Sequence, residues 1–149
     1  MSKIEVENFL YAKNIPFESY LFSEERNQTT TPIFKTLVLK GNKTGPIIAL
    51  VPLNNRLDYK KTAKLTKNRK IGLPPIEIAF ELTGYPHGAN TPVGIFLHHP
   101  DYLFLFDATI YQFNKIAISA GERYKGIIIA VDELIKLIQP IVADLLQSE

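Results

Sequence analysis

The feature that most constrains the fold is a pair of β-rich apolar runs, Ile33–Lys40 and Ile47–Val51, joined by a short polar connection. The connection, Gly41–Pro46, contains glycine and asparagine, which supply the backbone conformations of tight turns. The spacing therefore predicts an antiparallel hairpin. Lys35 lies among apolar neighbours in its first strand, and an ammonium group there must reach solvent or an anionic or carbonyl partner. We therefore expect Lys35 to face a polar ligand.

The other apolar patterns predict a mixture of helices and strands that neither alternate strictly nor segregate, with a polar loop at Ser23–Thr31. We expect an α+β fold: one domain over residues 1–149, with a curved, barrel-like mixed sheet flanked by helices. Helices are expected from a capping box at Ser2 and Glu5 to Asn14, from Asp58 through Thr66, from Pro74-Pro75 to Gly84, and from an N-cap at Asp132 with Pro140 as a kink or restart. Strands are expected at Phe17–Phe22, Leu103–Phe106, Ile116–Ser119 and Ile127–Val131.

Composition sets bounds on the protein class. A chain of 149 residues, 46% of them apolar, can bury an ordinary core without staples. The lack of cysteine excludes disulfides, thiolate zinc sites and a cysteine nucleophile, and it fits a reducing compartment. The N-terminal residues are partly acidic and no apolar run approaches the roughly 18 residues that span a bilayer. We therefore expect a cytoplasmic protein with no membrane partner.

Charge is unevenly distributed along the chain. The formal net charge of +2 is too small for a general polyanion binder, so no DNA partner is expected. Lysines commonly fill exposed helix positions, so a solvated helix face and a phosphate-contacting face both remain open. The basic cluster, within eleven residues, consists of Lys60, Lys61, Lys64, Lys67, Arg69 and Lys70.

Two loops could carry a binding site. Gly84–Gly94 has three glycines and two prolines in eleven residues, after an expected helix and before an expected strand. Glycine lets backbone N–H groups approach a ligand, and proline reduces the entropy lost on binding. Ser119–Arg123 can form a second turn in which Ser119 donates a hydrogen bond and Arg123 meets a carboxylate or phosphate. The alternative interpretation is structural: the first loop only turns the chain, and the second is a capped β-turn with a surface arginine.

A metal-dependent hydrolase is not favoured by the histidine pattern. Such a site would need two or three of His87, His98 and His99 with a carboxylate such as Asp101. Adjacent histidines on an extended segment point to opposite sides, so His98 and His99 are a poor ligand pair. No nucleophile elbow, P-loop or dinucleotide fingerprint is present either.

Six segments occur together in an order and spacing that resemble one known family. They are Phe34–Val38, Ala49–Pro52, Leu57–Lys61, Leu82–Tyr85, Gly88–Pro92 and Ser119–Arg123. The set resembles the YbaK/prolyl-tRNA-synthetase-associated domain family of aminoacyl-tRNA deacylases. This resemblance implies a trans-editing enzyme that clears a mischarged small amino acid (Ala, Cys or Ser) from tRNA, expected to be tRNA-Pro, without a metal or cofactor. An aminoacyl-tRNA synthetase is a further partner it implies.

The resemblance also implies roles for individual residues. Lys35, Gly88 and Pro92 form the expected catalytic set: the lysine holds the terminal phosphate or adenosine region of the tRNA, and the loop shapes the amino-acid pocket. Lys60, Lys61 and Lys64 are expected to contact tRNA or to dock a synthetase, ribosome or other partner. The expected substrate-binding residues are Thr36, Gly84, Tyr85, Ala89, Asn90, Thr91, Ser119, Gly121 and Arg123.

Three departures from the family pattern bear on function. Only the polar stretch Ser23–Pro32 stands where family members usually carry a helix. Ala89 and Asn90 occupy middle positions of the pocket loop, which commonly reads glycine-glycine-apolar-Ser/Thr-proline in the family. Gly126 stands where cysteine-selective members tend to have an aspartate. An alternative interpretation is therefore a catalytically silent tRNA- or nucleotide-binding module of the same fold.

Overall fold

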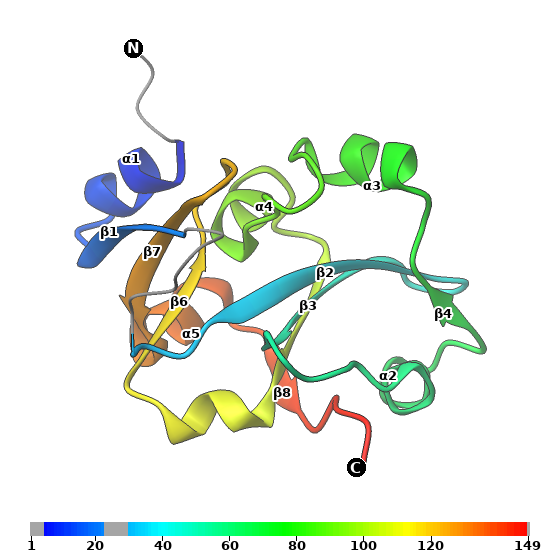
Figure 1. Cartoon of the computed structure of the whole chain (residues 1–149). Helices are drawn as coiled ribbons and strands as arrows, with labels where there is room; N and C mark the ends of the chain where they lie inside the picture. Colours follow the sequence, from blue (N-terminus) through cyan, green and yellow to red (C-terminus); the bar gives the residue numbers. More distant parts are fainter. Residues whose placement is uncertain (1–4, 23–29, 149) are drawn as a thin grey trace.

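Two β-sheets form the framework of the computed structural model, which describes residues 5–22 and 30–148 (Figure 1). The five-stranded sheet has the order β4-β2-β3-β5-β8, and the three-stranded sheet has the order β1-β7-β6. The helices are α1 (Glu5–Ala12), α2 (Tyr59–Thr66), α3 (Ile76–Thr83), α4 (Pro92–His98), a 3₁₀ helix η1 (Ala108–Gln112) and α5 (Val131–Ile138). The strands are β1 (Phe17–Leu21), β2 (Phe34–Gly41), β3 (Gly45–Pro52), β4 (Ile71–Gly72), β5 (Leu103–Asp107), β6 (Lys115–Ser119), β7 (Lys125–Ala130) and β8 (Ile141–Ala143).

The predicted hairpin is confirmed as β2 and β3. The two strands pair antiparallel from Phe34 opposite Pro52 to Gly41 opposite Gly45. On its other side β2 pairs with β4 only at Lys40 and Gly41. On the side away from β3, the first part of β2, Phe34–Leu39, therefore has no strand beside it in the described chain. We call this segment the open edge of β2.

The two sheets meet just before this open edge. Ile33 forms a parallel bridge with Ala117 of β6, and the Ala117 N–H donates to the Pro32 carbonyl at 2.8 Å. The sheets then diverge, since β2 continues toward β4 while β6 pairs with β7. The predicted α+β class with a mixed sheet flanked by helices is confirmed, but the sheets are not closed into a barrel. A strand edge beside a second sheet is a place where a ligand can reach backbone groups.

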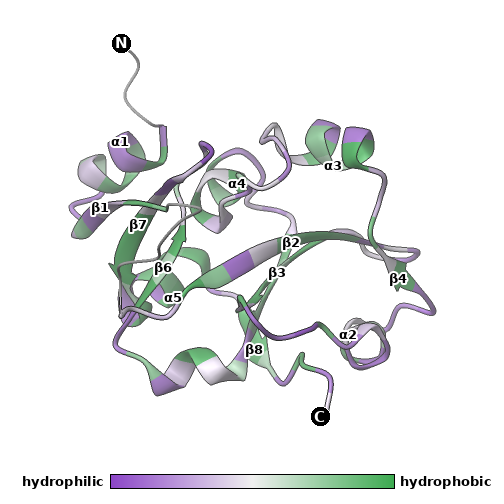
Figure 2. Ribbon diagram, in the orientation of Figure 1, coloured by the Kyte–Doolittle hydropathy of each residue, from purple (hydrophilic) through white to green (hydrophobic). Residues whose placement is uncertain are grey.

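Both faces of the β2–β3 hairpin are buried, which explains its nearly continuous apolar sequence. Side chains alternate between the faces. One face, including Val38, Ile48 and Leu50, packs into a core shared with α1, α4 and α5. The other face, including Leu39 and Ile47, packs into a second core with Leu57, Leu145 and other residues near α2 and the C-terminal segment. The strands are accordingly hydrophobic and α2 is largely hydrophilic in Figure 2.

The ends of α2 and α3 lie where the capping residues predicted them. The Asp58 carboxylate accepts a hydrogen bond from the Lys61 N–H at 2.9 Å at the start of α2. Gly84 ends α3 in a left-handed conformation, with φ 78°, and its N–H donates to the Phe80 carbonyl at 2.7 Å. These are the usual N-terminal and C-terminal helix caps, and both predictions are confirmed.

The segment after the glycine-proline loop is a helix, and the expectation of a strand directly after this loop was wrong. Thr91 caps α4, accepting a hydrogen bond from the Gly94 N–H at 3.5 Å, and Pro92 occupies its first turn. Proline at a first helical position and threonine at the cap both favour this start. Four consecutive buried residues hide the helical period, which is why the run resembles a strand.

Two expectations at the C-terminal helix were also wrong. Helix α5 begins at Val131, with Ala130 at the cap position, so Asp132 lies in the first turn and makes no side-chain cap hydrogen bond. The helix ends at Ile138, and the chain after Pro140 forms β8, parallel to β5, instead of a continued helix. Proline removes the N–H that a helix would need, and the β-branched residues that follow it suit a strand.

Some expectations fall on residues that are not described. Ser2 of the expected capping box and residues 23–29 of the expected polar loop lie outside the described ranges. Within residues 5–22 and 30–148, no helix has the length and apolar character needed to cross a bilayer.

Candidate functional site

A cavity of about 330 Å³ lies at the open edge of β2. The loop after α3 and the ends of β1, β6 and β7 complete its walls. Most of the lining is apolar or aromatic, with a few polar groups, which is the usual make-up of a small-molecule site. The lining residues are Phe22, Ile33, Phe34, Lys35, Thr36, Leu53, Gly88, Asn90, Ser119 and Tyr124.

Lys35 brings to this cavity a positive charge that no described acidic side chain pairs. Among the ion pairs of the described residues, none involves Lys35. Its side chain leaves β2 on the face shared with Leu37, whereas Thr36 points to the opposite face. Lys35 and Thr36 both line the cavity, because the cavity lies at the open edge of β2, where both faces of the strand are accessible. An unpaired ammonium beside a cavity attracts an anionic or carbonyl group of a ligand.

The open edge of β2 adds backbone groups to the site. The Leu53 N–H donates to the Ile33 carbonyl at 2.9 Å, so the odd-numbered residues of β2 form the hydrogen-bonded pairs with β3. The alternate residues, including Phe34 and Thr36, direct their N–H and C=O groups to the open edge. The Thr36 hydroxyl is also buried, and it has no hydrogen-bond partner among the residues that the structure describes. Buried polar atoms are rarely left unpaired, so this hydroxyl is a candidate contact for a ligand.

The glycine-proline loop is fastened to β6 by Ser119. The Ser119 hydroxyl donates to the Ala89 carbonyl at 3.1 Å and accepts from the Gly121 N–H at 3.1 Å. Gly88 has φ 86°, a conformation that favours glycine, and its N–H has no partner in the described residues. Asn90 accepts a hydrogen bond from the Thr83 hydroxyl at 2.9 Å. The loop therefore presents a free backbone donor and an amide at a fixed position.

Tyr85 packs behind the loop. A Cβ on Gly94 would overlap the Tyr85 hydroxyl, and a Cβ on Gly121 would lie 2.9 Å from the Tyr85 ring. The Tyr85 hydroxyl donates to Glu5 of α1 at 2.9 Å, and His98 bonds the same carboxylate oxygen at 2.7 Å. The His98 hydrogen bond lowers the pKa of Glu5, while burial raises the pKa of Tyr85. This cluster ties α1, the loop and α4 together.

The predicted site residues therefore fall into distinct places. Five of them line the cavity: Lys35, Thr36, Gly88, Asn90 and Ser119. Gly84 and Tyr85 line a second hollow, of about 400 Å³, beside Glu5 and His98. Ala89 and Thr91 are buried within the glycine-proline loop, and Pro92 is buried at the start of α4. Gly121 lies against Tyr85, and Arg123 is exposed.

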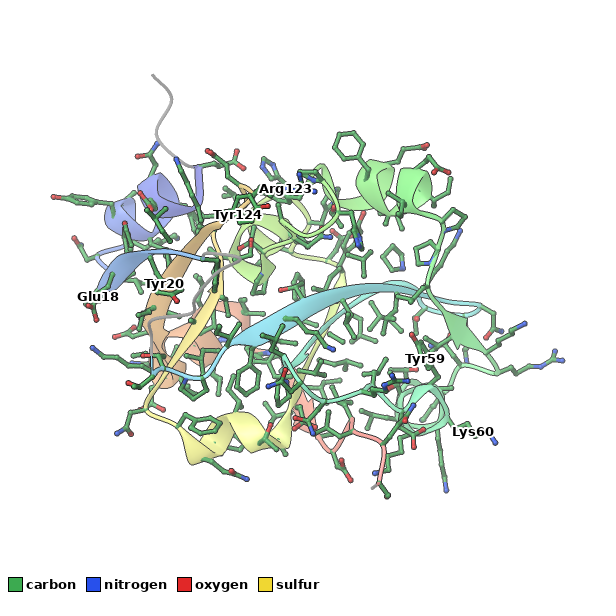
Figure 3. The ribbon with its side chains drawn as sticks, viewed as in Figure 1. Glu18, Tyr20, Tyr59, Lys60, Arg123 and Tyr124 are labelled. Atoms are coloured by element: carbon green, nitrogen blue, oxygen red, sulfur yellow. The ribbon has the colours of Figure 1, made fainter. Side chains whose placement is uncertain are left out.

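The basic helix α2 lies away from the cavity. Figure 3 shows Tyr59 and Lys60 on the opposite side of the molecule from Arg123 and Tyr124. Lys60 and Lys64 are exposed, but the Lys61 ammonium bonds the Asp144 carboxylate at 2.8 Å and the Leu146 carbonyl at 2.8 Å. The Asp144 hydrogen bond raises the pKa of Lys61. Lys61 thus holds the C-terminal segment against α2.

The sequence analysis did not select several lining residues: Phe22, Ile33, Leu53 and Tyr124. Their apolar or aromatic character at strand ends is compatible with core packing, so the sequence alone carries no signal for them. One signal exists for Phe22, which directly precedes the polar stretch: its ring packs on Gly126, where any Cβ would overlap the ring. A glycine inside the apolar run of β7 indicates such a close approach.

No group of three or more histidine, aspartate or glutamate side chains that could hold a metal is found among the described residues. His98 is engaged with Glu5 instead, at the far side of the loop from Lys35.

Comparison with known proteins places this geometry in a family. The family model of the aminoacyl-tRNA editing domain matches residues 22–137. The chain belongs to the aminoacyl-tRNA editing domain family. The match includes every residue that lines the cavity.

Individual relatives agree with this assignment. An Enterococcus faecalis protein named "Putative Cys-tRNA(Pro)/Cys-tRNA(Cys) deacylase EbsC" is 39% identical over 105 residues. The match covers 70% of this chain and 62% of that protein, so it spans less than two thirds of the relative's length.

Solved structures share the fold. The crystal structure of a hypothetical protein, APE2540, has a TM-score of 0.80 at 22% identity, covering 95% of this chain and 99% of that one. The crystal structure of "a putative trans-editing enzyme for prolyl tRNA synthetase" has a TM-score of 0.75 at 20% identity, covering 99% of this chain and 100% of that one. At these sequence identities the likeness shows a shared fold only. That fold is the α+β architecture that the sequence predicted.

Proposed function

We propose that this protein is a trans-editing aminoacyl-tRNA deacylase that hydrolyses the ester between a mischarged small amino acid and the 3′ end of a tRNA in the cytoplasm. The observation that carries the proposal is the convergence of Lys35, Gly88 and Ser119, from three separate segments, on one cavity of about 330 Å³. Membership of the aminoacyl-tRNA editing domain family supports the same chemistry.

The geometry supplies binding and polarisation rather than a protein nucleophile. An aminoacyl ester is already activated, so a positioned water and a stabilised oxyanion are sufficient for hydrolysis. The Gly88 N–H, which has no partner in the described residues, is a backbone donor at the cavity that can meet the developing oxyanion. Lys35 holds the phosphate or ribose oxygens of the terminal nucleotide, and Thr36 supplies a hydroxyl beside it. None of these steps requires a metal.

For the substrate we propose Ala, Cys or Ser on tRNA-Pro, with Cys tested first. The name of the Enterococcus faecalis relative supports Cys-tRNA(Pro). Cysteine-selective family members tend to have an aspartate at the position of Gly126. Because this chain lacks that aspartate, the Ala, Cys and Ser esters should all be tested. Size selection by a pocket is weak, since one methylene is worth only about 1–3 kcal/mol, which is why a separate editing enzyme is useful.

The test is deacylation of Ala-, Cys-, Ser- and Pro-tRNA-Pro by the wild type, Lys35→Ala and the control Lys64→Ala. We expect selective hydrolysis of at least one mischarged species, lost in Lys35→Ala and retained in Lys64→Ala, because Lys64 is exposed on α2. If all four esters decay at the buffer rate while the tRNA still binds, the protein is a silent binding module and the enzymatic proposal is wrong.

A further inference from the structure

Two aromatic residues form a wall of the cavity that the proposed chemistry does not use. Phe22 follows β1, and Tyr124 lies in the turn between β6 and β7. The Phe22 N–H donates to the Tyr124 carbonyl at 2.7 Å, so the two residues are adjacent although about a hundred positions separate them in the sequence. Both side chains line the cavity that Lys35 reaches.

The Phe22 ring is held in place from two sides. Its ring carbons Cε2 and Cζ lie where a Cβ of Gly126 would otherwise be, and the Tyr20 ring packs against it in a T-shaped pair with 4.9 Å between centroids. Both neighbours come from the described strands β1 and β7, which pair along their whole length. A ring held in this way is a preorganised surface for a flat group.

Tyr124 has a backbone conformation that costs energy. Its φ is 65°, in the left-handed region, which costs a non-glycine residue about 1–2 kcal/mol. Asn14, Lys67 and Gln139 share positive φ values, but each of these lies at or just beyond the end of a helix. Tyr124 is the third residue of the tight turn Glu122–Lys125, which the Lys125 N–H closes by donating to the Glu122 carbonyl at 3.1 Å, and a positive φ is usual at that position. Tyr124 is 45% exposed and lines the cavity, so the turn presents this residue at the cavity wall.

A cation lies beside this aromatic wall. The Arg123 guanidinium is 6.0 Å from the centroid of the Tyr124 ring, and Figure 3 shows the two side chains together at the β6–β7 turn. Aromatic rings with adjacent cations are the usual means of binding unpaired nucleotides, through base stacking and phosphate contact. A small aminoacyl group fills only part of a cavity of about 330 Å³, which leaves room for a base.

We infer that Phe22 and Tyr124 form a stacking site for the terminal adenine of the tRNA, while Lys35 and the Gly88 loop hold the ribose ester and the acyl group. This inference rests on the proposed function for the identity of the nucleotide. It assigns a binding role to two residues outside the predicted site, and it places the base on the β1–β7 side of the cavity.

The experiment measures equilibrium binding of two probes, adenosine 5′-monophosphate and ribose 5-phosphate, which differ only in the base. We expect the wild type to prefer the nucleotide, and Phe22→Leu and Tyr124→Leu each to weaken its binding about 5- to 150-fold, the range of one lost stacking contact. Ribose 5-phosphate binding should not change. Tyr124→Phe, which keeps the ring, should retain the preference, as should the control Tyr111→Leu on η1, a tyrosine that is 66% exposed.

The outcomes are separable from those of the deacylation assay. Equal affinity of the wild type for both probes, or no detectable nucleotide binding at millimolar concentration, overturns the inference even if the protein hydrolyses aminoacyl-tRNA. Loss of nucleotide preference in the leucine variants supports it even if no ester is hydrolysed. If Phe22→Leu fails to fold, as judged by thermal unfolding, the comparison of Tyr124→Leu with Tyr124→Phe tests the inference alone. An unchanged preference of Tyr124→Leu for the nucleotide over ribose 5-phosphate then overturns the inference.

Discussion

The cavity at the open edge of β2 and the basic helix α2 both carry lysines, but the lysines differ in what surrounds them. Lys61 on α2 has its charge matched by the Asp144 carboxylate and the Leu146 carbonyl. Lys35 has no ion-pair partner within residues 5–22 and 30–148, and it lies beside the buried, unpaired hydroxyl of Thr36.

The difference shows that local charge density is a poor guide to a site. Six basic residues in eleven positions make α2 and the segment after it conspicuous in the sequence, yet one of them, Lys61, is engaged in holding the C-terminal segment. A single lysine on a buried strand is inconspicuous, yet it brings the unmatched charge to a cavity. Unsatisfied polar groups at a concave surface indicate ligand binding better than the number of charges does.

The largest expected effect is on catalysis and should separate the two regions. Lys35→Met keeps most of the side chain's length and removes the charge, and we expect deacylation of the preferred aminoacyl-tRNA to fall about 100-fold or more, as for loss of a group that stabilises the transition state. Lys64→Met on α2 should change the rate less than about 2-fold, because exposed single charges contribute little. Single-turnover deacylation rates of the two variants measure these effects. Similar losses of rate in Lys35→Met and Lys64→Met would contradict the distinction between the cavity and α2.

The second effect is on stability. Gly121→Ala would place a Cβ 2.9 Å from the Tyr85 ring at a position with φ 101°, so we expect about 2–4 kcal/mol of destabilisation. Gly45→Ala, at the hairpin turn beside α2, has φ 77° but open space around the Cβ, so only the backbone cost of about 1–2 kcal/mol applies. Denaturant unfolding compares them; equal losses would mean that Tyr85 moves aside freely.

A smaller effect is expected from the cluster behind the loop, and it depends on pH. The pKa of Glu5 is lowered by its hydrogen bond to His98, so its ionised form stabilises the fold above its ordinary pKa of 4.5. This contribution is lost as pH falls through the lowered pKa. The melting temperature of the wild type should therefore exceed that of Glu5→Gln near neutral pH and converge with it in acid. A difference that grows toward low pH would contradict this assignment.

The smallest effect is expected at Lys61 and Asp144, which are solvent-exposed. Their hydrogen bond lowers the pKa of Asp144, so the stabilisation is present above the ordinary carboxyl pKa and is lost as pH falls through the lowered value. Asp144→Asn should lower the melting temperature slightly at neutral pH and low salt, with no change in deacylation. The difference should shrink at high salt, since exposed pairs are screened; persistence at high salt would indicate a role in packing.

Local rules predicted the parts of the fold that local interactions determine. The hairpin turn, the Asp58 cap and the Gly84 cap depend on neighbours in sequence, and each lies where its residues predicted it. Helix α4 and strand β8 depend on burial and on pairing with β5, which sequence spacing does not encode. An apolar run buried on all sides has no visible period, so α4 could not be distinguished from a strand.

The candidate site divides in the same way. Lys35, the glycine-proline loop and Ser119 were selected from residue patterns, family resemblance completed the set, and the structure gathers five of the predicted residues around one cavity: Lys35, Thr36, Gly88, Asn90 and Ser119. Their functional roles remain predictions. Phe22 and Tyr124 were not predicted, because they meet only through the pairing of β1 with β7, and an aromatic residue at a strand end carries no sign of which neighbours it will have.

The seat of Phe22 on Gly126 couples two positions that lie far apart in the sequence. Any side chain at position 126 requires the Phe22 ring to shift, because even a Cβ would overlap it. Substitutions at the two positions should therefore be non-additive in their effect on stability.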